Sequence, residues 1–258
     1  MENNQLNPLP GEERILLILG LDTTTLSCSV ALLQDDRLLA EMTTSIKKTH
    51  SERLMPMLDT LLKEAGLERE ELQAVAAAAG PGSFTGLRIG VSTARALAQG
   101  LGIPAVPVCT LEALAEAAIS PGALICPLLD ARRSQVYSAL YRRSPEEPYP
   151  LETLLEPQAL ALDELAKALR SCDGPVIFLG EGLHSYTNAL REALPGQAVI
   201  APAPYRVCRA ALVACRARLI LQKDPEAPYE KLLPIYLRRP EAERLAAKKR
   251  KKRNEAEK

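Results

Sequence analysis

Short apolar runs separated by turn residues predict strands over the first part of the chain. Residues 15–19 form a continuous apolar run, residues 27–33 form a second one after a hydroxyl-rich turn, and residues 37–43 form a third after Asp35-Asp36. Apolar runs of this length between turn residues are typical of β-strands, and short turns join strands that pair antiparallel. We therefore expect a three-stranded antiparallel meander.

The spacing of apolar residues then changes to that of a helix. From Thr49 or Ser51 onward, leucine and methionine recur at helical spacing, which predicts a helix capped by one of these two hydroxyl side chains. Residues 74–79 are again a short apolar run, and residues 104–108 are another. Both are predicted to be buried strands.

A glycine-rich segment lies between these two strands: Gly80-Pro-Gly-Ser-Phe-Thr-Gly-Leu-Arg-Ile-Gly. It predicts a tight turn followed by a helix, with Ser83 as the N-cap. Free amide groups and the positive end of the helix dipole would meet in this turn, a geometry that suits an anion. A tight turn without a ligand is the alternative.

Small residues recur every fourth position along this helix, at Gly82, Gly86, Gly90, Ala94, Ala98 and Gly102. A mid-helix glycine costs about 0.5 to 1 kcal/mol relative to alanine, so the ridge predicts a very close neighbour. This helix and the one before it carry more apolar residues than one core needs. We expect a partner-binding surface formed by Leu54, Met55, Leu58, Leu62, Gly86, Gly90, Ala94 and Arg95.

The second half of the chain predicts another lobe. Its pattern indicates a strand hairpin, an exposed proline-rich loop, and then alternating helices and strands that end in a long helix. The predicted elements are strands at 124–129 and 136–141, a helix at 162–169, a strand at 176–179, a helix at 185–194, a strand at 198–200 and a helix at about 207–222. The predicted divisions are a disordered N-terminus (1–13), a first lobe (14–108), a reduced second lobe (109–238) and a basic tail (239–258).

Composition agrees with two lobes in the cytoplasm. A chain of 258 residues with 47% hydrophobic content can bury two modest cores. It has no apolar run of 18 residues and no basic-then-apolar start, so we expect neither a membrane span nor a signal peptide. Its six cysteines form no CxxC pair, so we expect reduced thiols and no metal site.

The net charge of zero conceals an asymmetry. Residues 238–258 carry ten Lys or Arg against four Asp or Glu, which leaves 22 basic and 28 acidic residues elsewhere. The unbroken cationic run 248–253 could contact the phosphates of a nucleic acid. A solvated tail is the commoner meaning of such a run.

Candidate chemistry is sparse. His50 and His184 stand in no recognisable nucleophile motif, so catalysis by histidine is not expected. An Asp beside threonines could hold a magnesium-bound phosphate through water. The resulting candidate for a weak, residual nucleotide site comprises Asp22, Thr23, Thr24, Gly80, Gly82 and Ser83.

Four ordered motifs resemble one protein family. They are Leu19-Gly-Leu-Asp-Thr-Thr-Thr, His50-Ser-Glu-Arg-Leu-Met-Pro-Met-Leu-Asp, the Gly80 segment, and Asp130-Ala-Arg-Arg with Gln135-Val-Tyr, followed by weaker matches at Gly180-Glu-Gly and Tyr236-Leu-Arg. Together they are similar to the TsaB (YeaZ) family of tRNA threonylcarbamoyladenosine biosynthesis proteins. That resemblance implies an α/β fold of two ribonuclease-H-like lobes, as in actin-like ATPases and sugar kinases, with the second lobe reduced.

The resemblance also implies a role. It implies a non-catalytic cytoplasmic subunit that binds TsaD, with TsaE, to form N6-threonylcarbamoyladenosine at position 37 of ANN-decoding tRNAs. It implies self-pairing when TsaD is absent, and ATP or ADP with magnesium only within the complex. The metal-binding histidines of TsaD correspond to Thr110 and Leu114 here, neither of which replaces imidazole as a ligand. A stand-alone ATPase or small-molecule kinase of the same superfamily is the alternative.

Overall fold

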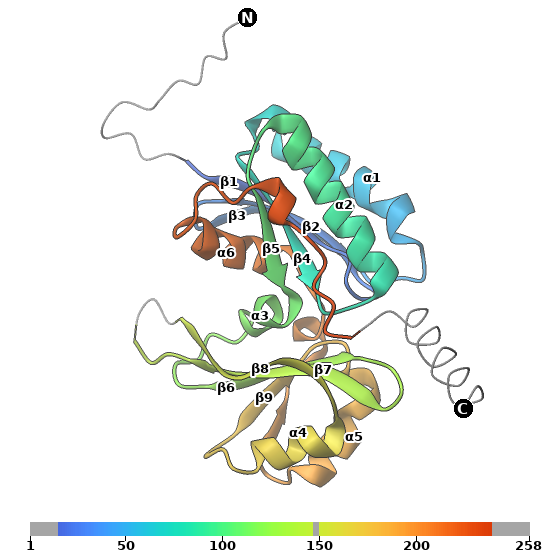
Figure 1. Cartoon of the computed structure of the whole chain (residues 1–258), viewed down its shortest axis with the longest axis vertical. Coiled ribbons are helices and arrows are strands. Elements are labelled where there is room, and N and C mark those ends of the chain that lie inside the picture. The colour runs from blue at the N-terminus through green and yellow to red at the C-terminus, as the bar shows by residue number, and fades with distance from the viewer. Residues whose placement is uncertain (1–14, 147–149, 239–258) are drawn as a thin grey trace, which may run out of the picture.

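The computed structural model describes residues 15–146 and 150–238, which form two α/β lobes stacked along the long axis of the molecule (Figure 1). The predictions made for residues 1–13 and 239–258 lie outside the described residues. Within the described ranges, no helix is both long and apolar enough to cross a membrane.

The first lobe is built as the apolar pattern predicts. Its elements are β1 (Leu17–Asp22), β2 (Cys28–Gln34), β3 (Arg37–Thr44), α1 (His50–Ala65), a 3₁₀ turn η1 (Arg69–Glu71), β4 (Ala74–Gly80), α2 (Phe84–Leu101) and β5 (Ala105–Cys109). The sheet order is β3-β2-β1-β4-β5. β1, β2 and β3 pair antiparallel, whereas β4 and β5 continue the sheet in parallel. This is the strand order of a ribonuclease-H-like lobe.

The second lobe repeats this topology. Its elements are α3 (Thr110–Ala115), β6 (Leu124–Asp130), β7 (Gln135–Arg143), β8 (Leu151–Ala161), α4 (Leu162–Leu169), β9 (Val176–Leu179), α5 (Leu183–Ala193), β10 (Ala198–Ile200), η2 (Ala203–Tyr205), α6 (Ala210–Leu221) and η3 (Tyr229–Lys231). Its sheet has the order β8-β7-β6-β9-β10, with β6, β7 and β8 antiparallel and β9 and β10 parallel. The predicted fold class, two ribonuclease-H-like lobes, is confirmed.

Strand β8 was not predicted from the sequence, which we interpreted as a loop in this region. It pairs antiparallel with β7 at the edge of the sheet. Most of its side chains are exposed or half-buried and it contains Pro157, so it lacks the apolar run of a central strand. Proline is tolerated on edge strands because an outer N–H needs no partner strand. With β8 in place, the lobe that we predicted to be reduced has all five strands of the first.

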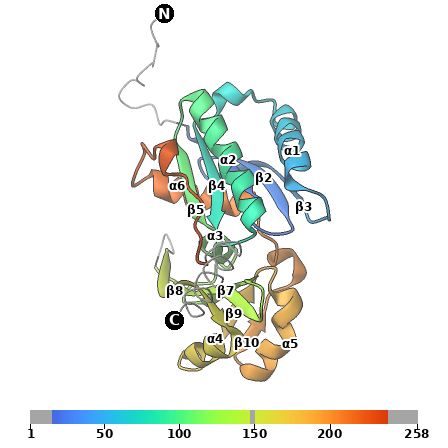
Figure 2. The same cartoon turned by 45° about the vertical axis from the view of Figure 1, so that its right-hand side comes forward.

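Two helices, α3 and α6, lie between the sheets, and α6 packs on the sheet formed by the other half of the chain. α1 and α2 cover the outer face of the first sheet, α4 and α5 the outer face of the second, and α3 and α6 lie between them (Figure 2). α6, which the sequence pattern assigns to the second lobe, packs against Ile18 and Ala76 of the first sheet. α3, which was not predicted, packs against Ile125 and Leu129 of the second.

The central strand β1 shows how closely α6 approaches. Leu19 and Leu21 belong to the core under α1, whereas Ile18 belongs to the core under α6. Gly20 is on the α6 face, where an added Cβ would overlap the carbonyl oxygen of Ala210. Side chains alternate between the two faces of a strand, so β1 is buried on both sides.

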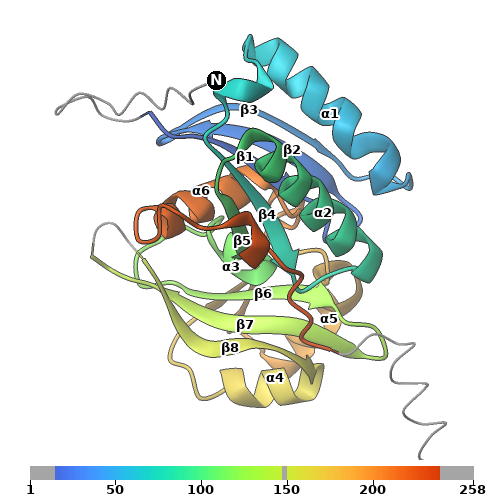
Figure 3. The same cartoon turned by 45° about the horizontal axis from the view of Figure 1, so that its top comes forward.

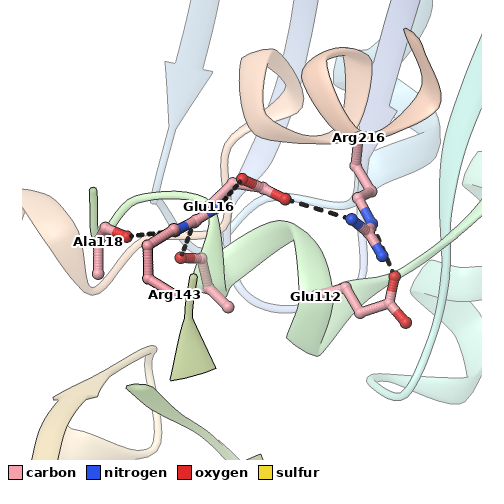
Figure 4. A network of polar contacts seen from close by, with 6 residues as sticks. Glu112, Glu116, Ala118, Arg143 and Arg216 are labelled. Atoms are coloured by element: carbon pink, nitrogen blue, oxygen red, sulfur yellow. Dashed lines mark hydrogen bonds and ion pairs between the residues drawn. The ribbon is translucent and has the colours of Figure 1, made fainter. Parts of the chain in front are cut away.

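A buried charge network joins α3 and α6 to the second sheet (Figure 4). Arg143 of β7 contacts Glu116, just after α3, at 3.0 Å and donates from Nε to the carbonyl oxygen of Ala118 at 3.1 Å. Arg216 of α6 contacts Glu112 at 2.8 Å and Glu116 at 3.5 Å. Since these charges are largely buried, losing one partner would leave the other uncompensated. The network therefore holds α3, α6 and β7 in one arrangement.

The chain ends its described part as a strap, residues 232–238, that runs from the first lobe to the second (Figure 3). The amide of Ile235 donates to the carbonyl oxygen of Ala79 at the end of β4, at 2.6 Å. Nη1 of Arg238 donates to the carbonyl oxygen of Ala131, just after β6, at 2.9 Å. The C-terminal strap thus connects the end of β4 with the end of β6.

The small-residue ridge of α2 packs on a turn of the same lobe. A Cβ added at Gly86 would overlap the carbonyl oxygen of Thr23, and one added at Gly90 would lie 2.5 Å from the Thr23 hydroxyl. The Thr23 hydroxyl also donates to the carbonyl oxygen of Gly86 at 2.7 Å. The close neighbour that the ridge predicts is therefore the turn after β1.

Alanine substitutions along α2 should separate this close contact from helix propensity. We expect Gly86→Ala to lower the free energy of unfolding by about 1 to 3 kcal/mol, because the turn must shift to admit a methyl group. Gly100→Ala is the matched control: nothing lies within 4 Å of its added Cβ, so it should stabilise the helix by about 0.5 to 1 kcal/mol. Urea unfolding of both variants measures the difference, and equal effects would contradict the packing described.

Candidate functional site

The two lobes enclose a cleft of about 630 Å³ at the carboxyl ends of their central strands. Four strands end at this cleft, and a residue at or just after the end of each one lines it. These residues are Thr24 after β1, Ser83 after β4, Asp130 at the end of β6 and Glu181 after β9. Ligand sites in open α/β sheets lie outside the carboxyl ends of the strands, which makes this cleft the first candidate site. Its lining residues are Thr24, Thr25, Leu26, Lys48, His50, Gly82, Ser83, Phe84, Thr85, Leu129, Asp130, Ala131, Arg132, Tyr137, Glu181, His184 and Ser185.

The predicted nucleotide residues are brought together, but their polar groups bind one another. Oδ1 of Asp22 accepts from the amide of Thr24 at 2.8 Å and from its hydroxyl at 2.7 Å. Asp22, Thr23 and Thr24 are each about 1% exposed. Of these three, Thr24 reaches the cleft wall, whereas Asp22 lies behind it.

The glycine turn closes over the same residues. The amide of Ser83 donates to the carbonyl oxygen of Thr24 at 2.6 Å, and a Cβ at Gly82 would overlap that oxygen. Gly80 has a φ of +127°, and an added Cβ would overlap the carbonyl oxygen of Ile235 in the strap. Gly82 and Ser83 line the cleft and Gly80 does not. The predicted N-cap is confirmed, since Oγ of Ser83 accepts from the amide of Gly86 at 3.4 Å.

Burial sets the electrostatics of this turn. Desolvation raises the pKa of Asp22 to about 6 from an ordinary 3.8, against the opposing hydrogen bonds from Thr24 and with a smaller contribution from the charge of Glu181. Oδ2 of Asp22 is buried and has no hydrogen-bond partner among the described residues. A magnesium-bound phosphate needs an open carboxylate, so the arrangement does not fit that group.

Several ionisable residues of the cleft were not predicted from the sequence to form a site. Lys48, His50, Arg132 and His184 line it together with Asp130 and Glu181. They come from segments that are far apart in the chain, and three of the motifs that carry the family resemblance contain His50, Asp130 and Glu181. The presence of these three residues in the motifs was the sequence signal that could have indicated a shared site.

His50 has a structural contact in the cleft wall. Its Nε2 lies 2.9 Å from the carbonyl oxygen of Thr25. Burial lowers its pKa, against the hydrogen bond to Thr25. No side-chain nucleophile lies among its hydrogen-bond partners, which are Thr25 and Arg53. In the described residues, no group of three His, Cys, Asp or Glu side chains is close enough to hold a metal ion.

The second candidate site is a groove of about 550 Å³ between α1 and α2 on the outer face of the first lobe. We refer to it as the helical groove; its lining residues are Ser51, Leu54, Met55, Phe84, Thr85, Arg88, Ile89, Ser92 and Thr93. Phe84 is 39% exposed, its ring centroid lies 5.3 Å from that of Tyr236, and the Arg88 guanidinium lies 4.0 Å from its centroid. The groove thus combines apolar side chains with one cation.

The predicted interface residues are mostly inside the first lobe. Met55 and Arg95 are half-buried and accessible. The remaining six are buried in the protein's own core and cannot contact a partner directly, apart from the floor of the helical groove at Leu54: Leu54, Leu58, Leu62, Gly86, Gly90 and Ala94. The small residues Gly86 and Gly90 of α2 lie against Thr23 of the same chain. Sequence periodicity alone does not show whether such a neighbour belongs to the same chain or to a partner.

The fold and the cleft define the class of protein: two ribonuclease-H-like lobes around a central cleft, as in actin-like ATPases. The family model of tRNA N6-adenosine threonylcarbamoyltransferase, TsaD, matches residues 37–246. Curated relatives named tRNA threonylcarbamoyladenosine biosynthesis protein TsaB include one from Bacillus subtilis, 36% identical over 88% of this chain and 96% of that protein. Another, from Escherichia coli, is 30% identical over 86% of this chain and 94% of that protein.

Solved structures agree. A crystal structure from Pseudomonas aeruginosa, described as similar to peptidase YeaZ, matches with a TM-score of 0.74 at 30% identity over 87% of this chain and all of that one. YeaZ from the same organism matches with a TM-score of 0.73 at 28% identity over 86% of this chain and all of that one. The chain therefore belongs to the TsaB family.

The buried carboxyl group predicts an unusual pH dependence. Its raised pKa means that the folded protein holds the Asp22 proton more tightly than the unfolded chain, so its contribution to stability falls as pH rises between about 4 and about 6. Asp22→Asn keeps an acceptor for Thr24 without the charge. Relative to wild type, it should gain about 1 to 2 kcal/mol in free energy of unfolding between pH 5 and pH 7.5.

Urea unfolding at the two pH values measures this gain. Asp36→Asn, at an exposed turn, is the control and should show no comparable gain. A constant difference between Asp22→Asn and wild type would contradict the assignment.

Proposed function

We propose that this chain is a non-catalytic subunit of the machinery that forms N6-threonylcarbamoyladenosine in tRNA, and that it acts by docking onto TsaD. Its relatives are named for this biosynthesis, and the family model it matches is that of the transferase. TsaE would join the same complex, and ATP or ADP with magnesium would bind within the complex rather than to this chain alone. Contact with tRNA would be indirect or through the basic tail.

The residues at the positions expected to carry chemistry support a non-catalytic role. Thr110 and Leu114, at the positions of the TsaD metal ligands, are buried in α3. The Asp22 carboxylate is hydrogen-bonded to Thr24 and is about 1% exposed. A kinase or ATPase of this fold would need the carboxylate of this turn to be accessible to a metal-bound phosphate.

The helical groove is the observation that carries the proposal. It lies on the outermost helical layer, where Met55, Phe84 and Ile89 leave apolar area accessible to a partner. A subunit with the same lobe would present an equivalent pair of helices, and two such pairs can pack as a four-helix arrangement. TsaD would supply that pair in the complex. A second copy of this chain would compete for it when TsaD is absent.

Charge substitutions in the groove should abolish docking. We expect Ile89→Asp and Met55→Asp each to weaken binding to TsaD by 100-fold or more, because an unpaired carboxylate buried in an interface costs several kcal/mol. Isothermal titration calorimetry with purified TsaD measures the affinity, and sedimentation of the chain alone measures self-association. Circular dichroism must show that both variants are folded.

Ile119→Asp is the matched control, since Ile119 is an aliphatic residue that is 79% exposed outside the groove. It should bind TsaD within about threefold of wild type. If both groove variants are folded and bind TsaD as wild type does, the docking surface lies elsewhere.

Alone, the chain should show no chemistry. We expect the purified protein neither to transfer threonylcarbamoyl to tRNA nor to hydrolyse ATP, since its described residues hold no group of three potential metal ligands and Asp22 is buried. Addition of TsaD and TsaE should restore transfer. Steady ATP hydrolysis by the chain alone would favour the kinase-like alternative.

A further inference from the structure

The carboxylate of Glu181, in the second lobe, is hydrogen-bonded across the cleft to the turn after β1 in the first lobe. Oε1 of Glu181, directly after β9, accepts from the hydroxyl of Thr25 at 2.7 Å. Its Oε2 accepts from the amide of Leu26 at 3.1 Å. A hydroxyl and a backbone amide that converge on two oxygens of one anion are the kind of donors with which proteins bind carboxylate and phosphate groups.

The backbone on the Glu181 side is fixed. The residue stands between Gly180, with a φ of +103°, and Gly182. A Cβ at Gly180 would lie 2.5 Å from the carbonyl oxygen of Leu128 and one at Gly182 would lie 2.8 Å from it. The amide of Gly182 donates to the same oxygen at 3.0 Å. The two glycines let the chain press against β6 and aim the side chain between them across the cleft.

The receiving turn is equally well ordered. The hydroxyl oxygens of Ser27 and Thr25 lie 2.8 Å apart. Ser27 can therefore donate a hydrogen bond to Thr25 while the Thr25 hydroxyl donates one to Glu181. On the other side of the turn, His50 contacts the carbonyl oxygen of Thr25 at 2.9 Å. The Thr25 hydroxyl is therefore oriented towards the carboxylate by its neighbours.

Two cationic side chains line the same cleft. They are Lys48 and Arg132, and the carboxylate of Asp130 lies in the lining with them. Yet the donors of the turn are already engaged by a group of the chain itself. An intramolecular ligand competes at a high effective concentration, which for short tethers is on the order of millimolar or above.

We propose that Glu181 is an internal ligand: its carboxylate occupies the anion-binding turn at Thr25 and Leu26, holds the second lobe against the first, and excludes phosphate-bearing molecules from that turn. The proposal goes beyond the docking function and does not depend on it. It gives a physical role to the segment Gly180-Glu-Gly, which docking on the helical groove does not use.

Removing the carboxylate should free the turn. We expect Glu181→Ala to raise the hydrogen-exchange rate of the Leu26 amide at least tenfold and to bind inorganic pyrophosphate at least tenfold more tightly than wild type. Glu181→Gln, which keeps the size of the side chain, should show the same changes to a smaller extent and guards against a folding defect in the alanine variant. Exchange is measured by NMR or mass spectrometry and pyrophosphate binding by calorimetry, on the full chain.

Two controls make the result decisive. Glu192→Ala removes an exposed carboxylate from α5, the helix that follows Glu181, and should change neither measurement. Adding Thr25→Val to Glu181→Ala should abolish the gained pyrophosphate binding, because one of the two donors is lost. If Glu181→Ala and Glu181→Gln bind pyrophosphate no more tightly than wild type, or if the gain persists in the double variant, the proposal is overturned.

Discussion

The first lobe depends on one close contact, between the backbone of the turn after β1 and the side-chain-free ridge of α2. Gly86 and Gly90 let the helix approach until Thr23 meets it with both its carbonyl and its hydroxyl group. That approach buries the turn and determines which residues of α2 remain outside. Because the turn is buried, Asp22 is desolvated and its hydrogen bonds go to Thr24 rather than to a ligand. Because α2 lies so close, its opposite side and α1 form the helical groove.

Local signals predicted most of the fold. Strands of the first lobe, the N-cap at Ser83 and the need for a close neighbour along the glycine ridge all follow from lengths, turn residues and helical spacing that a single segment contains. β8 and α3 escaped because neither has such a signal: β8 is a largely polar edge strand with a proline, and α3 has only six residues. The candidate sites were harder, since the cleft takes residues from four strand ends and its pairing of Glu181 with Thr25 spans 156 positions. The ridge was correctly predicted to need a neighbour, but periodicity cannot say whether that neighbour belongs to the same chain.

The cleft and the outer helices of this chain differ in how their side chains are engaged. The cleft is lined by polar residues, and Glu181 and Thr25 are hydrogen-bonded to each other across it. Behind its wall, one oxygen of Asp22 is bonded to Thr24. The outer helices retain accessible apolar surface. The chain thus has hydrogen bonds between its own groups in the cleft, and accessible apolar area on its outer helices.

The exchange of α6 between the halves has a consequence for biosynthesis. The first sheet is translated before residue 110, but the helix that covers its inner face comes from residues 210–221. For roughly a hundred residues of synthesis the growing chain therefore holds an apolar sheet face without its cover, including the alanine strand β4. Domains often fold in order as they leave the ribosome, yet this lobe can complete its core only when the C-terminal part of the chain has emerged. Until then, its exposed inner face is a natural site for chaperones to bind.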